Sequence, residues 1–253
     1  MIYCDAHIHL SHAQKPVFNA DEKYFCVSSC HSKEDLESVW RFQTSAFLSF
    51  GIHPQIVNSS YIKNSFSADI AFLENLIQNQ KIVAIGECGF DFFTAEYKST
   101  AREQEIVFNE QVKLAQKYNL PLVLHLRKSI EKIFSYSREL KKIPAVIFHS
   151  FPGTLREAEA LKNRGINAFF SFGKTLLNGK KSALDCMENL SIQNLLLETD
   201  APYQTLKGES QTFPSDIKKV YQKVCELRKV SMEELSEQIF ENFKAALCNA
   251  KNL

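Results

Sequence analysis

Short apolar runs recur along the chain at intervals that suit strands separated by helices. Eight of them stand out, at residues 2–8, 24–29, 45–51, 81–87, 121–125, 145–149, 167–172 and 194–200. Most are continuously apolar and do not alternate with polar positions, which is typical of parallel strands covered by helices. The pattern therefore predicts a parallel sheet that is buried on both faces.

Several segments between these runs carry the signals of amphipathic helices. The segments 32–42, 100–119, 154–165 and 231–247 each begin with Ser or Thr and have Asp or Glu three residues later, the pattern of a capping box. The pairs are Ser32 and Asp35, Thr100 and Glu103, Thr154 and Glu157, and Ser231 and Glu234. Apolar residues follow at helical spacing, and we expect them to pack against the sheet.

The alternation of strands and helices indicates the fold class. Eight strands that alternate with helices over 253 residues match a (β/α)8 TIM barrel, formed by a single domain spanning residues 1–253. A doubly wound sheet is the alternative, but no G-x-G-x-x-G motif follows a predicted strand. We interpret the polar stretch 203–214 as a loop over the mouth of the barrel.

Charge and cysteine content narrow the possible classes of protein. The formal net charge of +1 argues against a strongly basic nucleic-acid footprint, although bound metal ions can supply positive charge locally. Neither a signal-peptide pattern nor an apolar run of membrane-spanning length is present, so we expect a cytoplasmic protein that does not bind membranes. The seven cysteines, at positions 4, 26, 30, 88, 186, 225 and 248, are interpreted as reduced, packed thiols.

The first predicted strand and the residue after it carry three titratable side chains at alternate positions, Asp5, His7 and His9. Alternate residues of a strand point the same way, so these side chains should share one side. Burying polar groups without partners costs roughly 1 to 3 kcal/mol each. A metal ion would satisfy all three groups at once.

Further titratable residues fall at the ends of other predicted strands. They are His53, Glu87, His125, His149 and Asp200. The C-terminal ends of all the strands of a (β/α)8 barrel meet at the face where active sites lie. Each residue alone could instead be a half-buried structural histidine or a helix cap. Six of the strand-end residues together predict a metal site: His7, His9, Glu87, His125, His149 and Asp200.

The number of candidate ligands favours two ions. Four imidazoles, of His7, His9, His125 and His149, and two carboxylates, of Glu87 and Asp200, exceed what one tetrahedral ion with an open position needs. They suit two divalent ions roughly 3.5 to 4 Å apart that share a carboxylate and activate a water. Such ligands accept Zn²⁺ or Mn²⁺, and the carboxylates also permit Mg²⁺.

Six motifs, taken in order along the chain, resemble the TatD family of metal-dependent deoxyribonucleases, which belongs to the amidohydrolase-like barrels. They are "DAHIHL", "GIHP", "GECGFDFF", "EQVKLAQKYNLPLVLHLR", "FHSFPGT" and "LLLETDAPY". The resemblance implies that His7, His9 and Asp200 hold one ion and that His125 and His149 hold the other, with Glu87 bridging them. It also implies that Glu87 and Asp200 are catalytic, with Asp200 as the general base. The implied reaction is hydrolysis at DNA ends from 3′ to 5′, with RNA as a second substrate.

Three further residues are candidates for supporting roles. We expect His53 and Arg127 to contact substrate, Arg127 because it points to the same side as His125 and can bind a phosphate. The alternatives are a structural role for His53 and an ion pair with a loop carboxylate for Arg127. Asp91 is expected to orient a ligand or a loop.

The chain departs from the resembled family near the mouth of the predicted barrel. Where many relatives carry a basic R-G-K-x-N-x-P segment, this sequence reads "QTLKGESQTFP"; the usual "LDYY" is "FDFF", and Thr94 replaces an Arg. Two alternatives to a nuclease therefore stay open: a hydrolase of a small amide, lactone or phosphoester, and a metal-binding scaffold without turnover. We expect a monomer.

Overall fold

The computed structural model describes residues 1–41 and 46–247, and its centre is a sheet of eight parallel strands. The strands follow one another in sequence order around the sheet: β1 (Ile2–Ile8), β2 (Lys23–Cys30), β3 (Ala46–Phe50), β4 (Ala84–Asp91), β5 (Leu122–Arg127), β6 (Val146–Phe148), β7 (Ala168–Phe172) and β8 (Leu195–Leu197). The segment after β8 returns to β1, because Asp200 N donates to His7 O and His9 N donates to Ala201 O, both at 2.9 Å. The predicted barrel is confirmed, and a doubly wound sheet is excluded.

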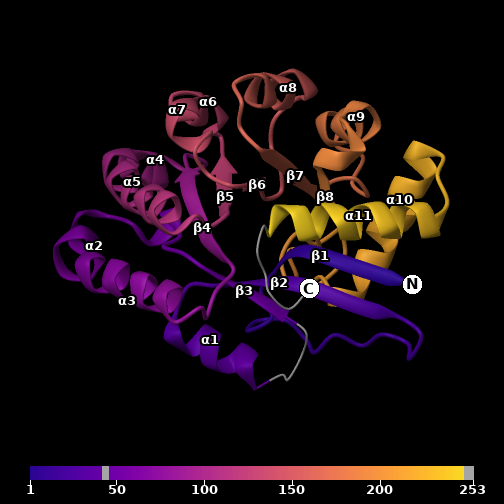
Figure 1. Cartoon of the computed structure of the whole chain (residues 1–253), viewed down its shortest axis with the longest axis horizontal. Helices are drawn as coiled ribbons and strands as arrows, with labels where there is room; N and C mark the ends of the chain where they lie inside the picture. The colour runs from indigo at the N-terminus through magenta and orange to yellow at the C-terminus, as the bar shows by residue number, and fades with distance from the viewer. Residues whose placement is uncertain (42–45, 248–253) are drawn as a thin grey trace.

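Helices surround the strands on the outside of the barrel (Figure 1). The α-helices are α1 (Lys33–Trp40), α2 (Ser59–Asn64), α3 (Phe66–Gln78), α4 (Ala95–Ser99), α5 (Ala101–Tyr118), α6 (Ile130–Phe134), α7 (Ser137–Leu140), α8 (Leu155–Asn163), α9 (Lys181–Asn189), α10 (Ile217–Arg228) and α11 (Met232–Ala246). Short 3-10 helices are η1 (Pro54–Ile56), η2 (Ile192–Asn194) and η3 (Pro214–Asp216). Within the described part of the chain, no helix has the length and apolarity needed to cross a membrane.

Three of the four predicted capping boxes are present, at the starts of α1, α8 and α11. The fourth prediction is wrong, because the Thr100 side chain does not cap α5 and its hydroxyl instead donates to Tyr97 O at 3.0 Å. An additional helix, α4, precedes α5 directly and is capped by Thr94. The predicted boundaries at Phe42 and Ser45 lie outside the described residues.

The strands of the barrel are buried, as the continuous hydrophobic runs predict. Strands β6 to β8 are buried along their whole length, and Phe148 stacks on Phe170 with ring centroids 5.2 Å apart. Cys4, Cys26, Cys30, Cys88 and Cys186 are free and buried, and burial raises the pKa of the Cys30 thiol to about 12. Packed thiols are therefore confirmed at these positions. Cys225 is free but only partly buried, and Cys248 lies outside the described residues.

The loop that follows β8 is anchored by a buried lysine. Lys174 is fully buried, and its Nζ lies 2.5 Å from Glu209 Oε2 and 2.8 Å from Asp216 Oδ2. Glu209 belongs to the stretch that departs from the resembled family, and Asp216 ends η3. The ion pairs therefore fix this loop beside the C-terminal end of the barrel.

Candidate metal centre

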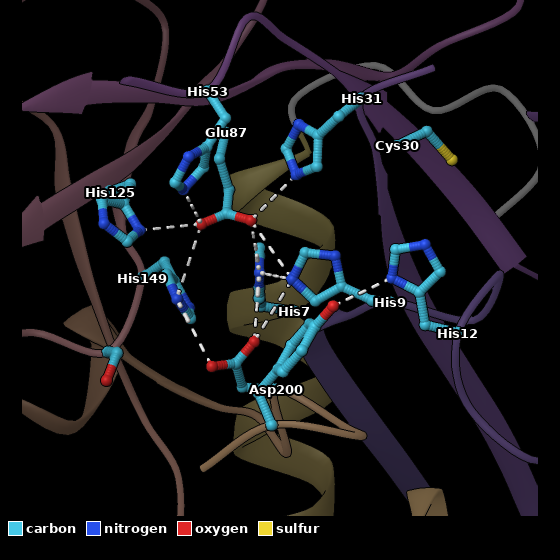
Figure 2. Close-up of polar contacts among 12 residues, drawn as sticks. His7, His9, His12, Cys30, His31, His53, Glu87, His125, His149 and Asp200 are labelled. Atoms are coloured by element: carbon cyan, nitrogen blue, oxygen red, sulfur yellow. Dashed lines mark hydrogen bonds and ion pairs between the residues drawn. The ribbon is translucent and has the colours of Figure 1, made fainter. Parts of the chain in front are cut away.

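Glu87 stands at the middle of a ring of imidazoles (Figure 2). Its Oε1 lies 3.2–3.3 Å from the Nε2 atoms of three histidines, His7, His9 and His31. Its Oε2 faces three others, His125 Nδ1 at 3.1 Å, His53 Nε2 at 3.7 Å and His149 Nε2 at 3.8 Å. Six histidines from five strands, β1, β2, β3, β5 and β6, therefore converge on one carboxylate, as the barrel topology requires.

Glu87 does not end its strand, contrary to the prediction. Strand β4 continues for four residues to Asp91, and its register with β5 shifts between Ile85 and Cys88. The shift lies beside Gly86, where a Cβ atom would come within 2.4 Å of Val123 O. Only glycine allows β4 to approach β5 this closely, so the irregular register around Glu87 depends on Gly86.

Asp200 faces the same histidines from the opposite side (Figure 2). Its Oδ1 lies 3.3 Å from His9 Nε2 and 3.7 Å from His7 Nε2, and its Oδ2 lies 3.9 Å from His149 Nε2. Gln204 Nε2 donates to Oδ2 at 3.0 Å and so holds the carboxylate in place. Asp200 is buried, like Glu87, so both negative charges need compensation nearby.

The pKa values show how strongly these groups interact. Burial opposes ionisation of Glu87 and Asp200, but the surrounding imidazoles outweigh it and hold both carboxyl pKa values below their ordinary range. Burial likewise opposes protonation of His9 and His149, yet the carboxylates raise their pKa to about 9 and about 10. Since a ligating imidazole must be neutral, a divalent ion would displace protons from both.

The donor set fits divalent cations. Three overlapping groups have ligand atoms within 4.8 Å of one another: His7, His9 and Glu87; His7, His149 and Asp200; and His53, Glu87 and His125. Among the residues that the structure describes, the buried Nδ1 of His7 finds no hydrogen-bond partner. Nitrogen and carboxylate oxygen donors are those that Zn²⁺ and Mn²⁺ accept. All six predicted ligands lie in this cluster.

Two carboxylates outside the ligand set orient the histidines. Glu198 Oε1 lies 3.1 Å from His149 Nδ1, and Asp91 Oδ2 lies 3.2 Å from His125 Nε2. Each pairing turns the other ring nitrogen toward Glu87, the arrangement that commonly supports metal-bound histidine. Asp91 thus lies where the sequence interpretation places it, whereas Glu198 was missed although it stands two residues before Asp200.

Asp5 does not share a site with His7 and His9, and this expectation is wrong. Its carboxylate accepts hydrogen bonds from Thr199 N at 2.9 Å, Thr199 Oγ1 at 2.6 Å and Tyr24 Oη at 3.0 Å. These hydrogen bonds lower the pKa of Asp5, but burial outweighs them and raises it to about 7. Asp5 therefore ties β1 to the segment after β8 and has a structural role.

A cavity of about 720 Å³ opens above Glu87 and is lined by both predicted substrate contacts, His53 and Arg127. The Arg127 guanidinium stacks 4.0 Å over the Phe93 ring, and its Nη1 lies 3.5 Å from Asp91 Oδ2. His53 also caps η1, since its Nδ1 accepts from Gln55 N at 3.2 Å. His53 therefore has the structural role that was its alternative. Arg127 pairs with a carboxylate that ends β4, not with one in a loop. Both residues also line the cavity.

The sequence interpretation also missed two histidines near the centre. His31 directly follows β2, just as His9 follows β1. The same reasoning about titratable residues at strand ends could therefore have identified it. His12 lies at the rim, where its Nε2 is 3.1 Å from Asp35 Oδ1 and its Nδ1 is 3.0 Å from Tyr203 Oη. No sequence signal relates His12 to Tyr203, which is 191 residues away.

Comparison with known proteins decides the family. The model of the family described as TatD related DNase matches residues 4–247. The chain belongs to the TatD family. Among its relatives in this family, the uncharacterized metal-dependent hydrolase YjjV of Escherichia coli is 28% identical over 201 residues, covering 78% of this chain and 74% of the relative. The 3′-5′ ssDNA/RNA exonuclease TatD of Pantoea ananatis is 31% identical over 201 residues, covering 76% and 74%.

Solved structures agree with this assignment. The crystal structure of Escherichia coli YjjV, a TatD homologue, superposes with a TM-score of 0.81 at 25% identity, over 96% of this chain and 97% of that one. A TatD-family hydrolase from Entamoeba histolytica superposes with a TM-score of 0.76 at 19% identity and supports the fold. The chain is thus a metal-dependent hydrolase of the TatD family, and the resemblance inferred from its motifs is confirmed.

Proposed function

We propose that this TatD-family hydrolase cleaves phosphodiester bonds at DNA ends, removing nucleotides from 3′ to 5′, with RNA as a second substrate. The observation that carries the proposal is the placement of Glu87 and its imidazoles beneath a cavity edged by Arg127, Lys128 and Lys180. Relatives named as 3′-5′ ssDNA/RNA exonucleases support it. A protein with a formal net charge of +1 can bind an anionic substrate here because its cations are concentrated locally.

The proposed centre holds two divalent ions, Mg²⁺, Mn²⁺ or Zn²⁺. His7, His9 and Asp200 would hold one, His125 and His149 the other, and Glu87 would bridge them. When bound, the ions would supply a nucleophilic water at neutral pH and positive charge for the phosphodiester oxygens. The three overlapping groups of candidate ligands, two of which contain Glu87, support a centre of more than one ion.

The protein's own residues would then position the substrate and move a proton. Asp200, held by Gln204, is the proposed general base that accepts the proton of the attacking water. Arg127 would donate to a phosphate oxygen from its place over Phe93. His53 would donate from Nε2, because its Nδ1 already accepts a hydrogen bond from Gln55 N.

A small-molecule hydrolase remains the second candidate, and the loop after β8 favours it. Its Glu209 carboxylate is held beside the mouth by Lys174, and Lys207 is its only cation. A cavity of about 720 Å³ has the size of a small-ligand site.

Labelled oligonucleotides separate the two candidates directly. Single-stranded DNA and RNA, each labelled at the 5′ end in one set and the 3′ end in another, are incubated with the purified protein and Mg²⁺, Mn²⁺ or Zn²⁺. We expect a ladder of shortened 5′-labelled products and early release of the 3′ label, both abolished by Asp200→Asn. Intact oligonucleotides combined with turnover of a lactone, an amide or a small phosphoester would favour the second candidate.

Two further expectations accompany this proposal. We propose that the protein acts as a monomer and that it works in the cytoplasm. Light scattering coupled to size-exclusion chromatography measures the first, and a mass close to 28.9 kDa is the expected value. A mass near twice that value would contradict it.

A further inference from the structure

His31 is the one histidine contacting Glu87 for which neither the sequence motifs nor the family resemblance provides a role. It lies in the turn between β2 and α1, and its Nε2 is 3.2 Å from Glu87 Oε1. Figure 2 shows its ring directed at this oxygen, beside those of His7 and His9. Its side chain is 21% exposed, so the ring is largely removed from solvent.

A backbone carbonyl determines which nitrogen of His31 carries the proton. Its Nδ1 lies 3.2 Å from Gly51 O, and a carbonyl oxygen can only accept a hydrogen bond. Nδ1 is therefore the protonated nitrogen, and in the neutral ring Nε2 has a free lone pair. Gly51 packs closely against the backbone of β4, since a Cβ atom there would lie 2.6 Å from Glu87 O.

The backbone of His31 is fixed as well. Its N–H donates to Asp35 Oδ2 at 3.0 Å, and the same carboxylate oxygen accepts from Ser32 N at 3.1 Å as part of the capping box of α1. The side chain thus starts from a rigid point and ends on a rigid acceptor. Ligating histidines are commonly oriented in this way, with the second ring nitrogen donating to a carbonyl or a carboxylate.

His53 provides the contrast that makes the tautomer of His31 informative. Its Nδ1 accepts from Gln55 N at 3.2 Å, and a backbone N–H can only donate. The neutral ring of His53 therefore has its proton on Nε2, the atom that faces Glu87 Oε2 at 3.7 Å. Thus His53 presents a proton to the carboxylate, whereas neutral His31 presents a lone pair.

A lone pair 3.2 Å from a carboxylate oxygen is repulsive unless a cation lies between them. The Nε2 atoms of His7 and His9 face the same oxygen at nearly the same distance. We propose that His31 is an additional protein ligand of the divalent ion bound at Glu87 Oε1. This inference rests on the metal centre of the proposed function and not on the nucleic-acid substrate.

A protonated His31 would instead form an ion pair with Glu87, and this alternative predicts the opposite behaviour. An imidazolium would compete with the metal ion for Oε1, so its removal would tighten metal binding. A ligand stabilises the bound ion, so its removal weakens binding. The direction of the change in metal affinity therefore distinguishes the two roles without any measurement of catalysis.

The experiment compares metal binding by the wild type, His31→Ala and His31→Gln after chelation and dialysis. Mn²⁺ is titrated calorimetrically, bound metal is counted by elemental analysis, and Co²⁺ is added to record its visible absorption bands. His12→Ala is the matched control, since His12 is a nearby histidine whose ring nitrogens face Asp35 and Tyr203. Circular dichroism and thermal unfolding establish that each variant is folded.

We expect both His31 variants to weaken one class of Mn²⁺ site by at least about tenfold and to change the Co²⁺ spectrum, with His12→Ala unchanged. Unchanged or tighter Mn²⁺ binding, with an unchanged Co²⁺ spectrum, would overturn the assignment of His31 while leaving the centre intact. Wild-type protein that binds no metal would overturn the centre and His31 with it. Metal binding without any nuclease activity would overturn only the proposed substrate, and His31 would still be tested.

Discussion

Two clusters of charge, each built around buried residues, lie near the C-terminal end of the barrel, and they are balanced in different ways. Around Lys174, two carboxylates meet two ammonium groups, because Asp216 also pairs with Lys219 at 2.7 Å. Around Glu87, two carboxylates meet imidazoles that compensate them only when protonated. The Lys174 cluster is electrostatically complete within the chain, whereas the Glu87 cluster reaches the same balance only with bound protons or cations.

The difference shows how one physical constraint yields either stability or function. Removing charges from water is unfavourable in both clusters, and each must offset that cost. The Lys174 cluster offsets it with permanent charges, so a change there should affect folding of the loop after β8. The Glu87 cluster offsets it with exchangeable cations, so a change there should affect metal binding and turnover.

The largest expected effect is the loss of turnover on removing the charge of Glu87, the proposed bridging ligand. Glu87→Gln replaces a carboxylate with a neutral amide, so the proposed shared anionic ligand disappears. We expect the rate constant for phosphodiester hydrolysis to fall about 10⁴-fold, equivalent to ~5.5 kcal/mol of transition-state stabilisation. Single-turnover assays with labelled DNA measure the effect, with Glu110→Gln on the outer face of α5 as control. A loss smaller than tenfold would contradict the bridging role.

The next largest effect is a loss of folding stability when the Lys174 cluster is broken. Lys174→Met leaves Glu209 and Asp216 without their buried partner, and we expect a loss of about 3 kcal/mol in the free energy of unfolding. Lys219→Met is the matched control, because Lys219 pairs with the same aspartate from an exposed position and should cost under about 1 kcal/mol. Urea unfolding measures both values. Equal losses in the two variants would refute the distinction.

The fold and most of the site could be predicted from the sequence because both depend on local patterns and one topological rule. The rule is that the C-terminal ends of all the strands of a (β/α)8 barrel meet at one face. Continuous apolar runs identify the eight strands, and the barrel then brings His7 and Asp200 together although they are 193 positions apart. The rule applies equally to His31, which follows β2 in the same way as His9 follows β1. That histidine was predictable and was overlooked.

Other features depend on contacts that no local pattern encodes. Asp5 shares a strand face with His7 by periodicity, yet Thr199 and Tyr24 occupy its oxygens first. Likewise, Thr100 has the capping-box spacing, but the preceding helix α4 leaves its hydroxyl bonded to Tyr97 O. In both cases a neighbour supplied by the tertiary structure competes with the interaction that the sequence pattern favours.

A smaller effect is expected where the Glu87 cluster meets the proposed substrate. Arg127→Gln removes a cation that borders the cavity, and we expect KM for DNA to rise about tenfold with kcat changed by less than threefold. Arg127→Lys retains the charge but loses the planar donor group, so its KM should lie between those of the wild type and Arg127→Gln. Steady-state assays over a range of salt concentrations measure these values. A fall in kcat alone would instead indicate that Arg127 acts through Asp91 and His125.

The smallest effect is a difference in acid sensitivity between the wild type and Lys174→Met. Burial raises the pKa of Asp216, but the hydrogen bonds from Lys174 and Lys219 outweigh it and hold that pKa below its ordinary value. As the pH falls, Asp216 therefore takes up a proton in the unfolded chain before it does so in the folded protein. The contribution of its carboxylate to the free energy of unfolding is complete above about pH 4 and is lost as pH falls through the folded pKa. The wild type should therefore lose more stability than Lys174→Met on acidification, so the gap between them narrows. Urea unfolding at several pH values between 3 and 7 measures the gap, and a gap that stays constant or widens in acid would contradict the ion pair.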